Sequence, residues 1–332
     1  MILVTGGAGF IGSVLVKALN DLGIDRIVVV DRMGRDGKWR NLSGLRYADF
    51  IHADDLWNPE HETLLNRIQE IYHLGACSST VEQDMDYLMK NNWEYSKKLF
   101  ALAVQSSCKF CYASSAATYG RGERGHEDKE SDVYNLRPLN AYGYSKQYFD
   151  EWVLMQKKLP KSWYGIKFFN VFGPNEYHKG SMSSVVFHAF HQIKKEGAVK
   201  LFKSYRKGVE DGEQKRDFVY VKDVARAVIA LMGSGPDEGS PSGLYNMGTG
   251  KARSFLDLAH ATFSSLGLSP NITFIPMPDD VREQYQYYTQ ADMTKFSNAV
   301  RDFEFTSLEE GIDDYVKSYL DTQDPYVAKP RA

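Results

Sequence analysis

A tyrosine and a lysine four residues apart are the side chains best suited to chemistry. Tyr142 and Lys146 stand in a segment of helical character that opens at Ala141, and residues four apart share one face of a helix. A tyrosine hydroxyl has an ordinary pKa of about 10, and a nearby ammonium group favours its ionised form. Such a pair can remove a hydroxyl proton while a hydride leaves the same carbon. The spacing therefore indicates oxidation and reduction of an alcohol carbon.

A serine upstream strengthens this hypothesis. Ser115 ends an apolar run that is typical of a buried strand, and a serine there can hold the substrate oxygen beside the tyrosine. A turn or a helix cap is the alternative role for such a serine. A YxxxK pair alone is a weak signal in a chain with 21 tyrosines, so the prediction depends on the other motifs.

A glycine turn at the N-terminus predicts a dinucleotide. The apolar run Met1–Thr5 leads directly into glycines at 6, 9 and 12, and a helical segment follows. This pattern is typical of a turn that lies under a pyrophosphate at a helix N-terminus. Asp31 ends the next apolar run, at about the distance where a carboxylate meets the adenosine ribose. The expected cofactor contacts here are Gly6, Gly9, Phe10, Ile11, Gly12 and Asp31.

The composition is that of an ordinary globular protein. The chain has 332 residues, 43% hydrophobic and 25% charged, and a formal net charge of −3. No basic field points to nucleic acid or to an anionic membrane, and no apolar run reaches the roughly 18 residues of a membrane span. We therefore expect a cytoplasmic protein without a signal segment. Cys108 and Cys111 form a CxxC that falls on a strand, so we expect no metal or redox site.

Strands and helices alternate through the first half, which predicts an α/β fold with a Rossmann-type, doubly wound parallel sheet. Expected strands are 2–5, 26–31, 49–52, 71–74, 110–113 and 163–169, and expected helices are 11–22, 60–69, 84–106 and 142–158. We assign residues 1–170 to the cofactor domain, with 217–247 returning to it. A smaller C-terminal substrate lobe comprises 171–216 and 248–321, and 322–332 form a polar tail expected to fray.

As a set, these motifs resemble the extended short-chain dehydrogenase/reductase family over nearly the whole chain. The motifs are the glycine turn, Ser114–Gly120 (SSAATYG), Tyr142xxxLys146, Phe169–Pro174 (FNVFGP) and Arg216–Val221 (RDFVYV). Narrower cues are similar to a branch of the family that epimerises an ADP-linked heptose at C6″. These cues are Gly75–Thr80 (GACSST), Tyr112–Gly120, His178–Met182 (HKGSM) and Tyr288–Asp292 (YTQAD).

The resemblance implies roles for individual residues. Ser115, Tyr142 and Lys146 match the catalytic triad, and Lys179 matches a second acid/base on the opposite face of the sugar. A surface lysine that pairs with a phosphate is the alternative for Lys179. Further implied cofactor contacts are Gly75, Ala76 and Asn92; implied substrate contacts are Asn170, Ser181, Phe202, Arg216 and Tyr285. The implied reaction oxidises C6″ with a tightly bound dinucleotide and returns the hydride to the other face of the ketone.

The residues near Asp31 are compatible with either of two dinucleotides, NAD and NADP. Asp31 alone favours NAD, because a carboxylate accepts the ribose 2′-OH and repels a 2′-phosphate. Arg32, Arg35, Lys38 and Arg40 follow closely, and such a cluster suits a phosphate. The family often uses NADP with a lysine at the position of Lys38, so we expect NADP and keep NAD open. Arg32 stands where relatives often carry Asn.

Other functions remain as alternatives. A UDP-sugar 4-epimerase of the same fold is the nearest. A 4,6-dehydratase is disfavoured, because Ala116 and Ala117 stand where that class places an Asp-Glu pair. A dinucleotide-binding sensor without catalysis is more remote, because such proteins usually lose the tyrosine or the lysine. The resemblance further implies a homo-oligomer, a pentamer among relatives, and a role in building the lipopolysaccharide core.

Overall fold

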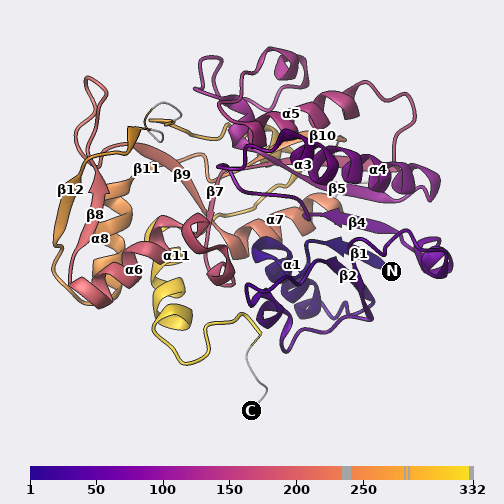
Figure 1. Ribbon diagram of the computed structural model, residues 1–332, viewed down its shortest axis with the longest axis horizontal. Helices are drawn as coiled ribbons and strands as arrows, with labels where there is room; N and C mark the ends of the chain where they lie inside the picture. The colour runs from indigo at the N-terminus through magenta and orange to yellow at the C-terminus, as the bar shows by residue number, and fades with distance from the viewer. Residues whose placement is uncertain (234–240, 280–281, 283–284, 329–332) are drawn as a thin grey trace.

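The centre of the molecule is a seven-stranded parallel sheet (Figure 1). A computed structural model describes residues 1–233, 241–279, 282 and 285–328. The strand order is β10-β6-β5-β4-β1-β2-β3. The strands are β1 (Ile2–Thr5), β2 (Ile27–Asp31), β3 (Asp49–His52), β4 (Glu70–His73), β5 (Lys109–Ser115), β6 (Ser162–Phe168) and β10 (Gly243–Met247). The sheet confirms the predicted α/β Rossmann-type fold.

Helices cover both faces of this sheet, which explains the continuous apolar runs of its strands. Successive side chains of a strand point to opposite faces. Val4 and Val29 join the core cluster that includes α1 (Phe10–Asp21) and α7 (Val221–Gly233). Leu3 and Val28 belong to the second cluster, under α4 (Tyr95–Gln105) and α5 (Ala141–Leu154). The two clusters fix the orientation of the strands and therefore the edge at which their carboxyl ends meet.

The rest of the chain forms two small sheets with their own helices, seen at the left of Figure 1. One sheet has the order β11-β9-β7, and the other pairs β12 with β8. Their strands are β7 (Asn170–Phe172), β8 (Val199–Phe202), β9 (Lys215–Tyr220), β11 (Ala252–Ser254) and β12 (Ile272–Ile275). The helices packed on them are α6 (Val185–Glu196), α8 (Phe255–Ser265) and α11 (Leu308–Tyr315), whereas α10 (Thr294–Ala299) packs against β10. Residues 217–220 thus lie in β9, outside the central sheet, whereas β10 pairs with β6 inside it. The division into two lobes stays a prediction.

Two predicted helices are shorter or more irregular than expected. The segment 84–106 is divided into α3 (Met85–Leu88), a π-helical turn (Met89–Glu94) and α4. The segment 60–69 forms a 3₁₀ turn (Pro59–His61) and the one-turn helix α2 (Glu62–Leu65), because the chain must turn there to enter β4. Among the described residues, no helix is long and apolar enough to cross a membrane.

The prediction that the C-terminal tail frays is wrong for residues 322–328. Val327 is buried, and its backbone N–H donates to the Asn175 side chain (3.2 Å). The Tyr177 hydroxyl donates to the carbonyl of Pro325 (2.6 Å), and the ring of Tyr177 meets that of Tyr326 edge to face. These contacts anchor the tail on the segment that leads to Lys179. Residues 329–332 lie outside the described residues.

Candidate active site

The glycine turn between β1 and α1 is as tight as the sequence predicts. Gly6 has a φ of 70°, a conformation that side chains rarely adopt. A Cβ on Gly6 would lie 2.7 Å from the carbonyl carbon of Leu74, and a Cβ on Gly12 would overlap the Gly6 carbonyl oxygen. The turn therefore leaves space only for backbone, which is the cradle that a pyrophosphate requires. These residues fit a dinucleotide.

Asp31 lies beside this turn with every carboxylate oxygen engaged. It accepts the Ala8 backbone N–H on Oδ2 (2.9 Å), and on Oδ1 the Arg32 backbone N–H (2.7 Å) and the Lys38 ammonium (2.8 Å). The Arg32 guanidinium turns away and binds the carboxylate of Asp54 and the amide of Asn91 (3.0 Å). Lys38 is thus the cation that balances the acidic residue at the expected ribose position.

A cavity of about 780 Å³ runs from this turn across the carboxyl edge of the sheet to the smaller sheets. Its volume is in the range of ordinary ligand sites. Most of the predicted site residues line it: Gly6, Gly9, Phe10, Ile11, Gly12, Asp31, Lys38, Gly75, Ala76, Ser115, Tyr142, Lys146, Asn170, Lys179 and Arg216. The structure therefore brings together residues from both halves of the sequence.

Ser115, Tyr142 and Lys146 form one wall of the cavity. Ser115 ends β5, and its Oγ accepts the backbone N–H of Ala117 (3.1 Å). Tyr142 opens α5, whose first turn is capped by the side chain of Asn140. The Lys146 ammonium donates to the carbonyl of Ala113 on β5 (2.9 Å). A strand end and a helix start thus hold the three side chains against one another.

Burial is the main cause of the pKa shifts of Tyr142 and Lys146. It raises the pKa of Tyr142, and the nearby Ser115 hydroxyl lowers that pKa only in part. Burial lowers the pKa of Lys146 to about 8. The expectation that Lys146 depresses the pKa of the tyrosine is not met here, because the ammonium binds the Ala113 carbonyl instead. Tyr142 is therefore a neutral hydroxyl at neutral pH in this structure.

Lys179 lies on a different wall, in the 3₁₀ segment Tyr177–Met182. Its ammonium is 5.3 Å from the centre of the Phe10 ring, so it approaches the glycine turn from the side of the smaller sheets. Burial lowers the pKa of Lys179, and the buried carboxylate of Glu176 opposes this shift. A partly buried lysine with a lowered pKa gives up its proton more readily than an exposed one, which suits the role of a base.

Arg216 forms the far end of the cavity. Its guanidinium is buried, 5.0 Å from the ring centre of Tyr285 and 5.8 Å from that of Phe255. Burial lowers its pKa, but an arginine keeps its charge at any physiological pH. The guanidinium donates to the Lys215 carbonyl (2.9 Å), and its buried positive charge suits an anionic group of a ligand.

Five predicted contacts lie outside the lining of the cavity. Tyr285 packs on Arg216, Ser181 follows Lys179 in the same 3₁₀ segment, and Phe202 ends β8. Arg32 is paired with Asp54. The fifth, Asn92, is buried, and its amide holds the backbone of Cys77 and the hydroxyl of Ser145. Their roles stay predictions.

Sequence reasoning missed a buried hydrogen-bond chain behind the cavity. Gly75 N–H donates to Thr5 Oγ1 (3.2 Å), which lies 2.7 Å from Nδ1 of His73, and His73 Nε2 lies 2.7 Å from Ser96 Oγ. Since Ser96 donates to the Asn92 carbonyl (2.6 Å), Nε2 of His73 must carry the proton. Burial lowers the pKa of His73 to about 3, so the chain is neutral. No local motif marks it.

The lining also contains residues that were given no role from the sequence, among them His178, Gln286 and Thr289. The side chain of Gln286 donates to the Gly120 carbonyl and so connects the segment before Tyr288 to the serine segment. The Asn41 amide bridges the carbonyls of Ala8 and Asn175 (3.0 Å each) near His178. His178 and Thr289 lie in the motifs HKGSM and YTQAD quoted above, whereas Gln286 carried no signal.

A parallel sheet with a glycine cradle and a Ser-Tyr-Lys wall defines a class of dinucleotide-dependent enzymes, and the comparisons with known proteins give the family. The family model described as "NAD dependent epimerase/dehydratase family" matches residues 2–248. The chain belongs to this family.

Individual relatives carry a narrower name. An ADP-L-glycero-D-manno-heptose-6-epimerase of Fusobacterium nucleatum subsp. nucleatum is 48% identical, over 98% of this chain and 100% of the relative. A protein of the same name from Nitratidesulfovibrio vulgaris is 44% identical over 98% and 100%. The crystal structure of the Helicobacter pylori enzyme of that name matches with a TM-score of 0.78 at 31% identity, covering 96% of this chain and 95% of that one. These comparisons confirm the predicted family and the predicted epimerase class.

Proposed function

We propose that this protein inverts C6″ of ADP-D-glycero-D-manno-heptose, by oxidation and re-reduction of that carbon. The observation that carries the proposal is the placing of two proton-transfer groups, Tyr142 and Lys179, on different walls of one cavity. Inversion needs a proton acceptor and a proton donor that reach the two faces of one carbon. The name shared by the relatives supports the choice of sugar.

The side chains divide the chemistry between them. A dinucleotide bound at the glycine turn supplies a hydride acceptor that later returns the hydride. In one direction the neutral amine of Lys179 takes the proton of the C6″ hydroxyl, and the sugar becomes a ketone. The sugar then turns, and the Tyr142 hydroxyl protonates the ketone oxygen as the hydride returns. The product leaves a phenolate at Tyr142 and an ammonium at Lys179, which are the states that the reverse direction requires.

The remaining residues bind and orient. Ser115 and Asn170 are placed to hold sugar hydroxyls, and Lys146 to hold the nicotinamide ribose beside Tyr142. Arg216 offers a fixed positive charge to the diphosphate, and Phe202, Ser181 and Tyr285 complete the lobe around the ADP-sugar. Gly75 and Ala76, which follow β4, support the dinucleotide from the lining, and Asn92 in the π-helical turn supports it through Cys77.

The family requires a nicotinamide dinucleotide, and we infer that this chain takes NADP. Asp31 is neutralised by Lys38 and by two backbone N–H groups, so its repulsion of a 2′-phosphate is reduced. Lys38→Ala should weaken binding of NADP⁺ about tenfold or more and change binding of NAD⁺ little, measured by calorimetry on protein stripped of dinucleotide. Equal weakening of both would favour NAD.

The decisive experiment uses the purified protein without added dinucleotide. It is incubated with ADP-D-glycero-D-manno-heptose, and the C6″ configuration is followed by NMR. A mixture of the two epimers is expected. No conversion, even after addition of NADP⁺ and NAD⁺, would contradict the proposal. A panel of UDP-sugars tests 4-epimerisation, since a UDP-N-acetylglucosamine 4-epimerase of Methanobrevibacter ruminantium M1 matches with a TM-score of 0.79 at 25% identity, over 95% and 96% of the two chains.

The family resemblance also supports a location, an oligomeric state and a biosynthetic role for this protein. We infer a cytoplasmic homo-oligomer that supplies heptose for the lipopolysaccharide core. Sedimentation of the purified protein measures the number of subunits, for which relatives suggest five.

A further inference from the structure

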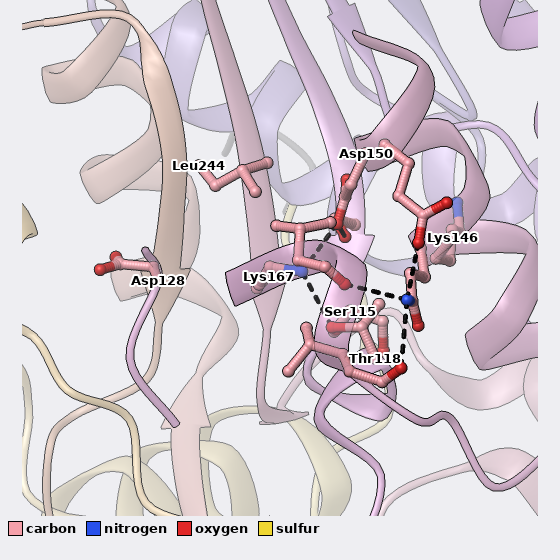
Figure 2. A network of polar contacts seen from close by, with 12 residues as sticks. Ser115, Thr118, Asp128, Lys146, Asp150, Lys167 and Leu244 are labelled. Carbon is pink, nitrogen blue, oxygen red and sulfur yellow. Dashed lines mark hydrogen bonds and ion pairs between the residues drawn. The ribbon is translucent and has the colours of Figure 1, made fainter. Parts of the chain in front are cut away.

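A buried ion pair lies directly behind the catalytic wall. The Lys167 ammonium is 2.7 Å from the Asp150 carboxylate, and the side chains are 1% and 0% exposed. Asp150 stands on α5 one turn beyond Lys146, and Lys167 stands on β6 in register with Ser114 of β5. Figure 2 shows Lys167 between Asp150 and Thr118, with Ser115 close by.

The pair holds the backbone on both sides of Ser115. Asp150 accepts the hydroxyl of Ser114 (2.7 Å) and, on its other oxygen, the hydroxyl of Tyr112 (3.0 Å). Lys167 also donates to Thr118 Oγ1 (2.9 Å), and Thr118 donates to the Ser115 carbonyl (2.8 Å). The residue before Ser115 and the carbonyl of Ser115 itself are therefore both attached to the ion pair.

Stability alone does not account for this arrangement. Taking two charges out of water costs more than a well-packed apolar pair would, so a buried ion pair is a poor way to stabilise a fold. The neighbours of Lys167 along β6 are apolar, from Trp163 to Phe168 apart from Gly165. A lysine in such a strand indicates a use for its charge.

We propose that Asp150 and Lys167 are positioning residues of the active site: together they fix the end of β5 that carries Ser115, and Asp150 stands one helical turn from Lys146, on the same face of α5. The proposal rests on the proposed function, since it takes Ser115 and Lys146 as catalytic. It adds two residues that do not line the cavity and do not touch the substrate.

The charges around Lys146 support this role for Asp150. Burial lowers the pKa of Lys146, and Asp150 is the largest influence in the opposite direction. The other titratable groups around Lys146 are few and are distributed over the elements that pack against α5. Those that act on Lys146 or on Asp150 are Tyr142 on α5, His73 at the end of β4, Cys77 beyond it, Tyr112 on β5, Tyr119 after β5 and Lys167 on β6. His73 is neutral, and Asp150 and Lys167 form the buried ion pair of this network.

The test is a direct titration of Lys146. The full chain is labelled with ¹⁵Nζ-lysine, and the Lys146 signal, assigned with Lys146→Met, is followed by NMR against pH. Asp150→Asn removes the negative charge and leaves Lys167 unbalanced, so the pKa of Lys146 should fall by about one unit or more. Lys167→Met leaves Asp150 unbalanced, so that pKa should rise by a similar amount. The alkaline limb of the kcat/KM profile should move in the same two directions.

Opposite shifts separate positioning from a merely structural role, because damage to the fold would lower activity in both variants without moving the titration in opposite directions. Each single variant leaves a charge unpaired, so Asp150→Asn/Lys167→Met restores neutrality where a single variant folds poorly. In that double variant the pKa of Lys146 should lie between those of the single variants, and kcat should fall with KM little changed, because Ser115 loses its support.

Two results would overturn the proposal. One is an unmoved Lys146 titration in Asp150→Asn, and the other is a double variant with the kcat of the wild type. Tyr142→Phe distinguishes this failure from failure of the proposed function. If Tyr142→Phe abolishes turnover while Lys146 titrates normally in Asp150→Asn, only the positioning role is wrong.

Discussion

The two sides of the cavity are built on different principles. Behind Tyr142 and Lys146, buried side chains satisfy one another, and the chain from Thr5 through His73 to Asn92 has short hydrogen bonds throughout. On the side of the smaller sheets, long cationic side chains lie against rings, with Lys179 over Phe10 and Arg216 beside Tyr285. One side is held by directional contacts and the other by contacts that tolerate movement.

This difference fits the two tasks that the cavity must perform. A dinucleotide must present one carbon to the same tyrosine in every turnover, which favours a wall with a single arrangement. The sugar must present both faces of one carbon, which favours partners that remain bound through a rotation. Cations over rings keep their attraction over a range of angles, whereas a buried hydrogen bond weakens steeply when it bends.

The sharpest test of the wall formed by Ser115, Tyr142 and Lys146 is Tyr142→Phe. Loss of the hydroxyl removes a proton donor and acceptor at a fixed position, so turnover should fall by a factor of about 10³ or more. Tyr144→Phe is the matched control, because Tyr144 stands on the same helix but is exposed, and it should retain the rate of the wild type. Epimerisation of ADP-D-glycero-D-manno-heptose measures both; turnover by Tyr142→Phe near the wild-type level would contradict the assignment.

The wall that carries Lys179, on the side of the smaller sheets, should be less sensitive to substitution. Lys179→Met removes the proposed base, but water can enter from the open side and replace it in part, so we expect a loss of about 10²-fold. The dinucleotide should remain bound, as its absorbance will show. Lys195→Met, at an exposed position of α6, serves as the control. A loss of binding of ADP-sugar with unchanged kcat would assign Lys179 to the phosphates instead.

The neutral hydrogen-bond chain predicts a pH dependence of stability. Because the folded-state pKa of His73 is about 3, the unfolded chain binds a proton below about pH 6.5 that the folded chain does not. The free energy of unfolding therefore falls as pH falls through this window. Between pH 7 and 5, His73→Gln should reduce that loss by about 2 kcal/mol, measured by urea denaturation at both pH values. His52→Gln, at an exposed position, should leave it unchanged.

The smallest effect is expected in the surface contacts that hold the substrate side together. Arg253 pairs with Asp257 and Glu309, and all three are partly exposed. Glu309→Ala should lower the free energy of unfolding by less than about 1 kcal/mol, and high salt should reduce this difference further. If Glu309→Ala lowered the free energy of unfolding by as much as the effect expected for the His73 hydrogen-bond chain, the contrast between the two sides of the cavity would be contradicted.

Local patterns predicted the sheet well. The bounds of β1 and β3 coincide with the predicted runs, because strands buried on both faces are read directly from apolar residues. Ser115 and Lys179 line the cavity. Both lie in short family motifs, and a motif can be recognised from neighbouring residues alone. The π-helical turn at Met89–Glu94 was not predicted, since its residues have no pattern that differs from an α-helix.

The supporting contacts were not predictable in the same way. Asp150 and Lys167 are ordinary charged residues in the sequence, and their pairing depends on how α5 crosses β6. One signal was overlooked: a lysine inside an otherwise apolar strand must find a buried partner. Gln286 comes from a segment without motif or periodicity, and only the folded chain brings it to the cavity.

The anchored C-terminal segment matters for anyone who handles this protein. Pro325 and Val327 hold Tyr177 and Asn175, which directly precede Lys179 in the chain. A purification tag or a fusion partner joined after residue 328 leaves these contacts intact, whereas trimming the chain at Thr322 to aid crystallisation would release the loop that carries Lys179. The C-terminal end of the sequence thus holds in place the loop that carries Lys179.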